Sequence, residues 1–416
     1  MTSFRRKLKK CNLMIIGASG GVANAFLHHL SDYRGLFRKI VLVDKNDRLL
    51  KDVYINHKLL DYVFIQKKIE LPDKEHEYLA LLKAHNIDIV LDITDMNSIE
   101  LLEATNKAGV SYINTAINDD KKNVEELYLD ILKRKNKTNK AVHILCTGMN
   151  PGNVNMWVRY GIEKFGVPKQ IIHFEYDTSK IAKKWHPMVT WSIHEFLVEC
   201  VQNPSGVALG RGKIKELLPN ALENRESMKK ILSPIMKLDK YPYGLTVLHE
   251  ENVSISYKYD VPSKFIYAIN PKTMQNLINI YEKKKKVTKK DLQLGDNTRE
   301  VLDGADNIGV ILDYEDKTIY YFNTCPNVAV IGTNATYTQV IIGIFSALFT
   351  RLVDKLPKKI YFVEDLYHTH FKYFMFDNMR VQEYVFSKNP KRHKLVHYNP
   401  MVKLKRRDRF EHLYII

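Results

Sequence analysis

The stretch IIGASGGVANAF, residues 15–26, decides the fold of the first part of the chain. An apolar run enters a glycine-rich turn, and small and apolar residues at helical spacing follow it. Residues without side chains let a backbone approach a phosphate group at the N-terminus of a helix. The spacing departs from strict G-x-G-x-x-G, because Ser19 and Val22 occupy two of the glycine positions. We predict strand, turn and helix, and a dinucleotide site; a purely structural turn is the alternative. The predicted cofactor-binding residues of the turn are Gly17, Ser19, Gly20, Gly21 and Val22.

The next apolar run, KIVLVD (39–44), ends in Asp44, about 24 residues beyond the turn. A carboxylate at this place can accept a hydrogen bond from the ribose 2′-hydroxyl of NAD, and it would repel the 2′-phosphate of NADP. The neighbouring Lys45 leaves NADP open. We predict NAD as the cofactor, with Asp44 as its ribose ligand.

Three further apolar runs are predicted strands: IDIVLDIT (87–94), SYINTA (111–116) and AVHILCTG (141–148). The stretch NSIELLEATNKA (97–108), between the first two, has a helical pattern. Alternating strands and helices predict a parallel, doubly wound sheet. Ligands bind such sheets at the carboxyl ends of the strands, where Thr94, Asp95 and Thr115 lie. These three residues are candidate cofactor contacts or, equally, ordinary polar loop residues.

We predict three parts of the chain. Residues 1–150 form the Rossmann dinucleotide-binding domain, and 151–330 form an α+β substrate and dimerisation domain. Its predicted strands are KQIIHFEYD (169–177), NVSISYKYDV (252–261) and NIGVILDYEDKTIYYFN (307–323). Residues 331–416 form a C-terminal helical segment that packs back on the first domain and ends in a basic tail. The fold class is α/β.

The net charge of the 416-residue chain is +17, and its basic runs lie at 4–10, 282–290 and 388–409. No zinc-finger, RRM or helix-turn-helix pattern accompanies them, so we interpret them as solvated surface and expect no nucleic-acid partner. No apolar run reaches about 18 residues, and no membrane span is expected. The four cysteines lie far apart, which is typical of reduced thiols in the cytoplasm. Neither they nor the histidines show the spacing of metal ligands, so we predict no metal site.

The stretch WSIHEFLVEC (191–200) raises a question about its polar face. On a helix, the apolar side chains of this segment share one face, and Trp191, Glu195 and Glu199 share the other. An indole beside two carboxylates indicates a site for an organic cation, because a cation over the indole face is stabilised by about 0.5–2 kcal/mol. The alternative is that Trp191 fills a domain interface while the glutamates are solvated. The predicted apolar face consists of Ile193, Phe196, Leu197, Cys200 and Val201.

Five stretches occur in one order along the chain: GMNPGNVNMWV (148–158), FEYDTSK (174–180), TWSIHEFLVEC (190–200), DGADNIGVILD (303–313) and NATYTQVIIGI (334–344). In this order they resemble the bacterial homospermidine synthase family, within the wider saccharopine-dehydrogenase-like group. The resemblance covers nearly the whole chain. It implies that NAD serves as a bound redox group and that two putrescines are converted into homospermidine with release of ammonia.

The resemblance also implies roles for single residues. Trp191 would lie at the substrate entrance, and Glu199 would hold the diamine. Asn150, which follows the last strand of the first domain, would contact both the nicotinamide and the pocket. Glu175 and His249 would be further pocket residues and, with Glu199, candidates for the proton-accepting group.

One position departs from the family's pattern. A glutamate that holds substrate typically follows the fifth strand, and this chain has Asn118 there, with Asp119 as a possible substitute. The closest alternative function is a dehydrogenase that makes carboxyspermidine or saccharopine by reductive amination. Such an enzyme would need an arginine for the substrate carboxylate, whereas the candidate segments carry only lysines. A non-catalytic dinucleotide sensor or nucleic-acid-binding protein is a third possibility. We expect a cytoplasmic homodimer that acts on a small diamine or polyamine.

Overall fold

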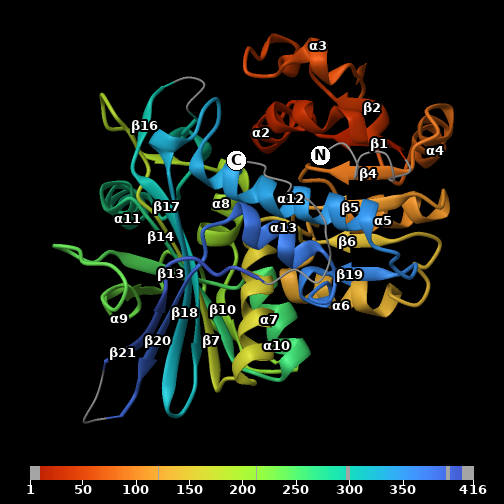
Figure 1. Cartoon of the computed structure of the whole chain (residues 1–416). Helices are drawn as coiled ribbons and strands as arrows, with labels where there is room; N and C mark the ends of the chain where they lie inside the picture. Colours follow the sequence, from red (N-terminus) through yellow and green to blue (C-terminus); the bar gives the residue numbers. More distant parts are fainter. Residues whose placement is uncertain (1–9, 120, 212, 297–299, 390–393, 405–416) are drawn as a thin grey trace. The chain divides into compact units, whose positions relative to one another are not determined.

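The computed structural model of the protein describes residues 10–119, 121–211, 213–296, 300–389 and 394–404 (Figure 1). The chain divides into two compact units. The first combines the residues up to Met156 with Thr338–Asn378, and the second combines Trp157–Tyr337 with Met379–Lys403. The domain boundaries expected at 150 and 330 stay predictions. Most of the basic run at 4–10 and the basic tail from 405 lie outside the described residues.

The first unit is built on a parallel sheet of seven strands in the order β19-β6-β5-β4-β1-β2-β3 (Figure 1). Without β19, this is the 3-2-1-4-5-6 order of doubly wound nucleotide-binding folds. The predicted α/β fold is therefore confirmed, whereas β3 and β19 were not foreseen. The strands are β1 (Cys11–Ile16), β2 (Phe37–Asp44), β3 (Val63–Gln66), β4 (Ile89–Asp92), β5 (Ser111–Asn114), β6 (His143–Leu145) and β19 (Ile360–Phe362).

The helices of the first unit cover this sheet, whose central strands are buried along their whole length. Asn97 caps α5 by accepting hydrogen bonds from the backbone N–H groups of Ile99 and Glu100. The helices are α2 (Gly21–Leu30), α3 (His57–Leu60), α4 (Glu75–Ala84), α5 (Ser98–Lys107), α6 (Val124–Arg134), most of α12 (Ala335–Val353) and α13 (Phe371–Asn378), with short 3-10 turns at Ser31–Leu36, Arg48–Lys51 and Val363–Asp365.

The long apolar helix α12 packs back on the first unit, as predicted. The ring of Phe345 lies 4.5 Å from that of Phe26 on α2, and the ring of Phe349 lies 5.2 Å from that of Tyr33. By length and hydropathy α12 could cross a membrane, but 78% of its apolar window is buried within the protein. A core helix of a globular protein has the same properties.

The second unit contains a mixed sheet of ten strands, with the path β11-β10-β14-β7-β17-β18-β20-β21 and with β13 joining β14 to β12. The predicted strand at 169–177 is confirmed as β7, and the stretch 307–323 is confirmed as the hairpin β17–β18. The strands are β7 (Gln170–Asp177), β10 (Ser205–Ala208), β11 (Ile214–Leu218), β12 (Arg225–Ser227), β13 (Tyr243–Val247), β14 (Ser263–Ile269), β17 (Ala305–Asp313), β18 (Lys317–Pro326), β20 (Gln382–Ser387) and β21 (Leu395–Asn399). Two small sheets pair β8 (Lys180–Ile181) with β16 (Leu302–Asp303) and β9 (Met188–Val189) with β15 (Gln293–Leu294).

Strand β14 shows that this sheet separates two apolar clusters, one on each of its faces. Phe265, Tyr267 and Ile269 pack in one cluster with residues of α8 and α11, while Ile266 and Ala268 pack in the other with residues of α9. This alternation is the two-residue period of a strand. Helices α7 and α10 lie side by side (Figure 1), and a hydrogen bond from Arg159 to Tyr259 joins them. The helices are α7 (Asn153–Phe165), α8 (Ile193–Leu197), α9 (Lys229–Leu232), α10 (Glu250–Tyr259) and α11 (Pro271–Lys284), with 3-10 turns at Lys289–Asp291 and Asn327–Ala329.

Three expectations about local structure need correction. The stretch 252–261 was predicted as a strand, but most of it belongs to helix α10, which packs on β14 and β10. Its alternating Val, Ile and Tyr imitate a strand, while the small serines between them let a helix be buried on nearly all sides. The segment from 331 onward is not only helical, because it supplies β19 to the first sheet and β20 and β21 to the second.

The third correction concerns the helix expected at 191–200. Helix α8 begins only at Ile193, after Ser192 as its N-cap, and continues as a π-helix over Val198–Gln202. The backbone N–H of Asn203 donates to the carbonyl of Val198 at 2.8 Å, five residues back. Trp191 therefore precedes the helix, and Glu199 lies in the wide π turn rather than in a regular α-helix.

Candidate active site

The glycine turn after β1 fits the phosphates of a dinucleotide. Gly17 has a φ of +83°, and a Cβ added there would lie 2.5 Å from the carbonyl oxygen of Ile93, so only glycine is accommodated. Gly20 is the N-cap of α2 and provides no side chain to satisfy the first N–H groups of the helix. Gly21 and Val22 form the first turn. These free donors at a helix N-terminus suit a phosphate.

Asp44 lies at the end of β2 and connects that strand to the glycine turn. One carboxylate oxygen accepts the backbone N–H of Ser19 at 2.9 Å. The other accepts the backbone N–H and the side-chain amide of Asn46 at 2.9 and 2.8 Å. The structure thus places Asp44 against the turn, where the ribose of a dinucleotide would approach.

The loops after β4 and β5 lie next to this turn. The Cγ2 of Thr94 is 2.7 Å from the position that a Cβ on Gly17 would take, and the Thr94 hydroxyl donates to Asp92 at 2.7 Å. Asp95, in the same loop, is exposed. Asn118 donates from its side-chain amide to the carbonyl of Thr94 at 3.3 Å. The structure therefore brings the predicted contacts Gly17, Thr94 and Asn118 together at the carboxyl ends of the strands.

The remaining predicted residues of the first unit lie in two tight turns. Asp119 caps its own turn, because one oxygen accepts the side-chain amide of Asn97 at 2.8 Å and the other accepts the backbone N–H of Lys121 at 2.8 Å. The carbonyl of Thr115 accepts the backbone N–H of Gly148 at 3.2 Å. Asn150 follows Gly148, is half-buried and precedes a cis proline. Thr115 and the Asn150 turn are thus neighbours.

In the second unit, His249 gathers three carboxylates at the start of α10. Its Nδ1 hydrogen-bonds to Glu251 and lies 3.1 Å from a carboxylate oxygen of Glu250, and its Nε2 lies 3.6 Å from Glu199. The side chain of Glu199 is 23% exposed, whereas that of Glu251 is fully buried. The structure therefore brings the predicted residues Glu199 and His249 into contact.

The protonation of these groups follows from their crowding. Burial alone would lower the pKa of His249, but the charges of Glu251, Glu250 and Glu199 outweigh it and raise that pKa well above its ordinary value. Burial raises the pKa of Glu199 to about 8, against the opposing effect of His249. His249 in turn outweighs burial at Glu251 and lowers the pKa of that carboxyl. The imidazolium of His249 thus faces Glu199, Glu250 and Glu251, and ionisation of Glu199 adds a negative charge to the cluster.

Trp191 lies beside a different carboxylate. Its indole N–H donates to the hydroxyl of Tyr267 at 2.8 Å, and its ring meets the rings of Phe196 and Tyr267 edge-on, at 6.1 Å in both cases. Tyr267 on β14 is paired with Glu175 on β7. Burial and then the charge of Glu175 raise the pKa of Tyr267. The expectation that Trp191 shares a polar helix face with Glu195 and Glu199 is wrong, because Trp191 precedes α8 and packs partly against the apolar cluster.

Sequence reasoning missed Tyr267, Glu250, Glu251 and His173. The two glutamates directly follow His249 in HEENVS and open helix α10, whose start was not predicted. His173 is buried and has no hydrogen-bond partner at either ring nitrogen, and burial lowers its pKa to about 4. His249, Glu250 and Glu251 also offer one donor atom each within 4.8 Å of one another. The expectation that no metal binds stays a prediction.

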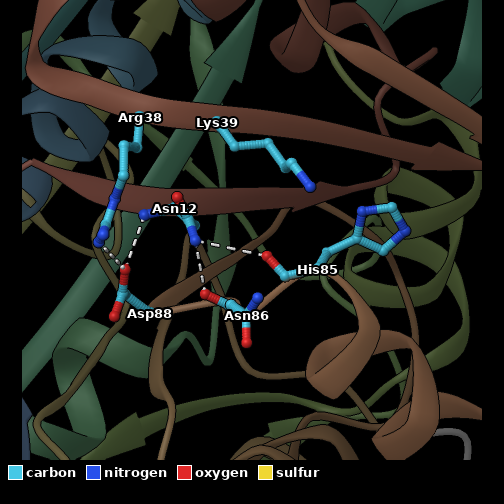
Figure 2. A pocket seen from close by; sticks show the side chains of 6 residues that line it. All are labelled: Asn12, Arg38, Lys39, His85, Asn86 and Asp88. Atoms are coloured by element: carbon cyan, nitrogen blue, oxygen red, sulfur yellow. Dashed lines mark hydrogen bonds and ion pairs between the residues drawn. The ribbon is translucent and has the colours of Figure 1, made fainter.

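A separate surface pocket lies at the amino ends of β1 and β2 and before β4 (Figure 2). Asn12 donates from its side-chain amide to the carbonyl of Asn86 at 2.8 Å, and Asp88 lies 3.6 Å from the guanidinium of Arg38. This end of the sheet is opposite to the glycine turn, so the pocket contains none of the predicted site residues. It is lined by Asn12, Arg38, Lys39, His85, Asn86 and Asp88.

A parallel nucleotide-binding sheet with this glycine turn is the architecture of an NAD(P)-binding domain. Residues 13–145 match the family described as the saccharopine dehydrogenase NADP-binding domain. The first unit is therefore an NAD(P)-binding domain of the saccharopine dehydrogenase type. A comparison of the sequence with curated proteins gives no match.

Two solved structures are similar in fold. The homospermidine synthase from Legionella pneumophila, in complex with NAD, is 18% identical, with a TM-score of 0.70 over 88% of this chain and 89% of that one. The saccharopine dehydrogenase (L-Glu forming) from Saccharomyces cerevisiae is 10% identical, with a TM-score of 0.59 over 90% of this chain and 100% of that one. At these identities the likeness is one of fold, over nearly the whole chain.

Proposed function

We propose that the protein is an NAD-dependent homospermidine synthase, which converts two putrescines into homospermidine and ammonia. The observation that carries the proposal is that the partly exposed carboxylate of Glu199 meets His249 beside the buried Glu250 and Glu251. A buried carboxylate is costly unless a positive charge binds beside it. A primary ammonium supplies that charge and three hydrogen-bond donors.

The aromatic residues suit the rest of such a substrate. A diamine carries a short aliphatic chain between its two ammonium groups, so its site needs apolar walls as well as carboxylates. Trp191, Phe196 and Tyr267 provide an aromatic cluster with Trp191 half-buried at its edge. We infer that the exposed part of the indole lies against a cation or its neighbouring methylene groups.

The choice of NAD rests on Asp44. Its carboxylate at the end of β2 would accept a ribose hydroxyl and would repel a 2′-phosphate. Ser19 and Asn46 already hold this carboxylate in place. NAD, when bound, supplies an acceptor and later a donor of hydride.

The residues of this chain would then bind the amine and handle its protons. An ammonium must lose a proton before the adjacent carbon can be oxidised, and Glu199, with its pKa of about 8, is matched to accept one near neutral pH. The permanent charge on His249 keeps part of the cluster neutralised. After imine exchange with the second amine and release of ammonia, the linking imine is reduced to the secondary amine. Glu175 and Asn150 are proposed as further contacts in this sequence.

Product analysis tests the function. Incubation with putrescine and NAD⁺ should give homospermidine and ammonia in equal amounts, without net NADH. A reductive-amination dehydrogenase would instead consume NAD(P)H stoichiometrically when given an amine with an oxo acid or with an aldehyde. Net consumption of reduced cofactor in that assay, with no homospermidine from putrescine, would overturn the proposal in favour of the alternative. A homodimer and a cytoplasmic location stay predictions.

A further inference from the structure

Four residues from distant parts of the second unit form one hydrogen-bonded row. Asp177 ends β7 and Asp306 begins β17, and the two face each other directly across the antiparallel pair. The hydroxyl of Thr190 lies 2.6 Å from a carboxylate oxygen of Asp177 and 2.8 Å from the hydroxyl of Thr336. The Thr336 hydroxyl lies 2.8 Å from a carboxylate oxygen of Asp306. All four side chains are at least 95% buried.

The row has more hydrogen bonds than hydroxyl protons. Its three contacts are all within hydrogen-bonding distance, and each needs one proton. Each threonine hydroxyl has a single proton to donate, so two ionised aspartates would leave one contact with two oxygens and no proton between them. The missing proton must therefore come from one of the carboxyl groups.

We propose that Asp177 and Asp306 share one proton through the hydroxyls of Thr190 and Thr336, and that this bridge holds Trp191 in place. The role of the bridge rests on the proposed function of Trp191, whereas the shared proton does not. Asp177 also accepts the backbone N–H of Ser179 at 2.8 Å, which favours its ionised form. With the proton on Asp306, this carboxyl donates to Thr336, which donates to Thr190, which donates to Asp177. One charge stays on the pair.

The surroundings keep the proton in the pair. Two buried carboxylates that face each other cannot both ionise at low cost, and burial raises the pKa of Asp177. The titratable neighbours are Tyr176 on the same strand, Tyr267 on β14 and Cys325 on β18. Burial, assisted by the aspartate charges, raises the pKa of each. All three are thus neutral at physiological pH.

The bridge acts on Trp191 through the residue before it. Thr190 is held by its hydroxyl and also by its carbonyl, which accepts the side-chain amide of Asn334 at 2.7 Å. Trp191 follows directly and reaches Tyr267 with its indole N–H. Loss of the shared proton would set two negative charges at this anchor. The four residues are thus positioning residues for Trp191.

The pH dependence of thermal unfolding tests the shared proton. The folded protein keeps this proton to a higher pH than a lone aspartate would, so its stability should fall as the pH rises through the upper pKa of the pair. Asp306→Asn supplies the donor permanently and removes one charge. Between roughly pH 5 and 9, this variant should gain about 2–4 °C of Tm relative to the wild type. The control is Asp239→Asn, at an exposed aspartate of the same unit. It should follow the wild-type profile, and parallel profiles for all three proteins would overturn the proposal.

Two further measurements complete the test. If Asp306→Asn does not fold, the infrared spectrum of the Glu199→Gln variant above pH 7 provides the test. The shared proton requires that the carbonyl stretch of a protonated carboxyl group persists there, and its absence would refute the proposal. The KM for putrescine tests the positioning role: it should rise more steeply with pH in the wild type than in Asp306→Asn. Equal rises would remove that role. If the wild type does not use putrescine, the proposed function is wrong. The pH profiles of Tm then still test the shared proton by themselves.

Discussion

The carboxylates of the two units differ in the groups that stabilise their negative charge. In the first unit, Asp44 accepts three N–H groups from Ser19 and Asn46. In the second, Glu199 shares the imidazolium of His249 with two other glutamates. A carboxylate whose oxygens are satisfied by nearby donors can serve as a fixed part of a binding turn. A buried carboxylate that shares its cation with others can be stabilised by a further positive charge that binds beside it.

The largest effect that this comparison predicts is for Glu199→Gln. The change keeps the shape of the side chain and removes the charge that would pair with an ammonium, so turnover of putrescine should fall by about 100-fold or more, with the fold intact. Steady-state rates together with Tm measure this. The control is Glu195→Gln, one turn earlier on α8, which should have a small effect. A Glu199→Gln variant that turns over putrescine nearly as fast as the wild type would show that the cluster does not bind the substrate.

Substitutions of Trp191 sharpen the role of the aromatic part of the site. Activity should fall in the order Trp, Phe, Leu, because the weaker quadrupole of Phe and its absence in Leu reduce stabilisation of a cation. A loss of about 1–2 kcal/mol corresponds to roughly five- to thirty-fold in rate. Since Trp191 also packs on the apolar cluster, Leu should lower Tm by a few degrees as well.

The hydrogen bond to Tyr267 requires its own control. Tyr267→Phe removes the acceptor of the indole N–H and leaves the indole face in place. We expect this variant to retain more activity than Trp191→Leu. Equal activities for Trp191→Phe and Trp191→Leu, with a shared fall in Tm, would reduce Trp191 to a packing residue and weaken the assignment of a cationic substrate.

Asp44→Ala tests the carboxylate of the first unit, whose oxygens already accept hydrogen bonds from Ser19 and Asn46. Loss of a ribose acceptor should weaken NAD binding by about tenfold and reduce discrimination against NADP, since one hydrogen bond to a charged group contributes roughly 1.5–3 kcal/mol, partly offset by water. Titration with both cofactors measures this. An unchanged Kd for NAD would mean that Asp44 serves only to connect Ser19 with Asn46.

The smallest effect concerns pH. With the pKa of Glu199 at about 8, the fraction that is ionised rises about fivefold between pH 7 and 8, and kcat/KM for putrescine should rise with it. Bound ammonium favours the ionised form, so the same limb in kcat should lie at lower pH. A flat kcat/KM profile over this range would argue against Glu199 as the group that meets the substrate's charge.

The first unit was largely predictable because its signals are local. The glycine turn and Asp44 are separated by one helix and one strand, and the strand order follows from alternation along the chain. The strands β3 and β19 were not found. Strand β3 is only four residues long and lies at the sheet edge, and β19 belongs to a segment more than 200 residues further along the chain than β6, its neighbour in the sheet.

The candidate site of the second unit could be predicted only in part. Glu199 and His249 are fifty residues apart in number; His249 was named only through resemblance to a family, and Glu199 also from the pattern of 191–200, on a helix face that the structure does not form. Their neighbours Glu250 and Glu251 open helix α10, which was missed because the two-residue alternation of 252–261 was interpreted as a strand. The direction of Glu199 depends on a π turn, whose extra residue leaves no mark in hydrophobic periodicity.

Because of that π turn, the conformation of this segment should be more sensitive to the insertion or deletion of a residue than to a substitution. Each residue added to or removed from a helix rotates everything after it by about 100°. Deletion of Val198 would restore a regular α-helix. It would turn Glu199 away from His249 and displace the carbonyl of Cys200, which accepts the backbone N–H of Leu222 at 2.9 Å. The number of residues between Trp191 and Glu199 thus determines where Glu199 lies. Deletion of a single residue here should inactivate the protein, whereas most substitutions of exposed neighbouring residues should not.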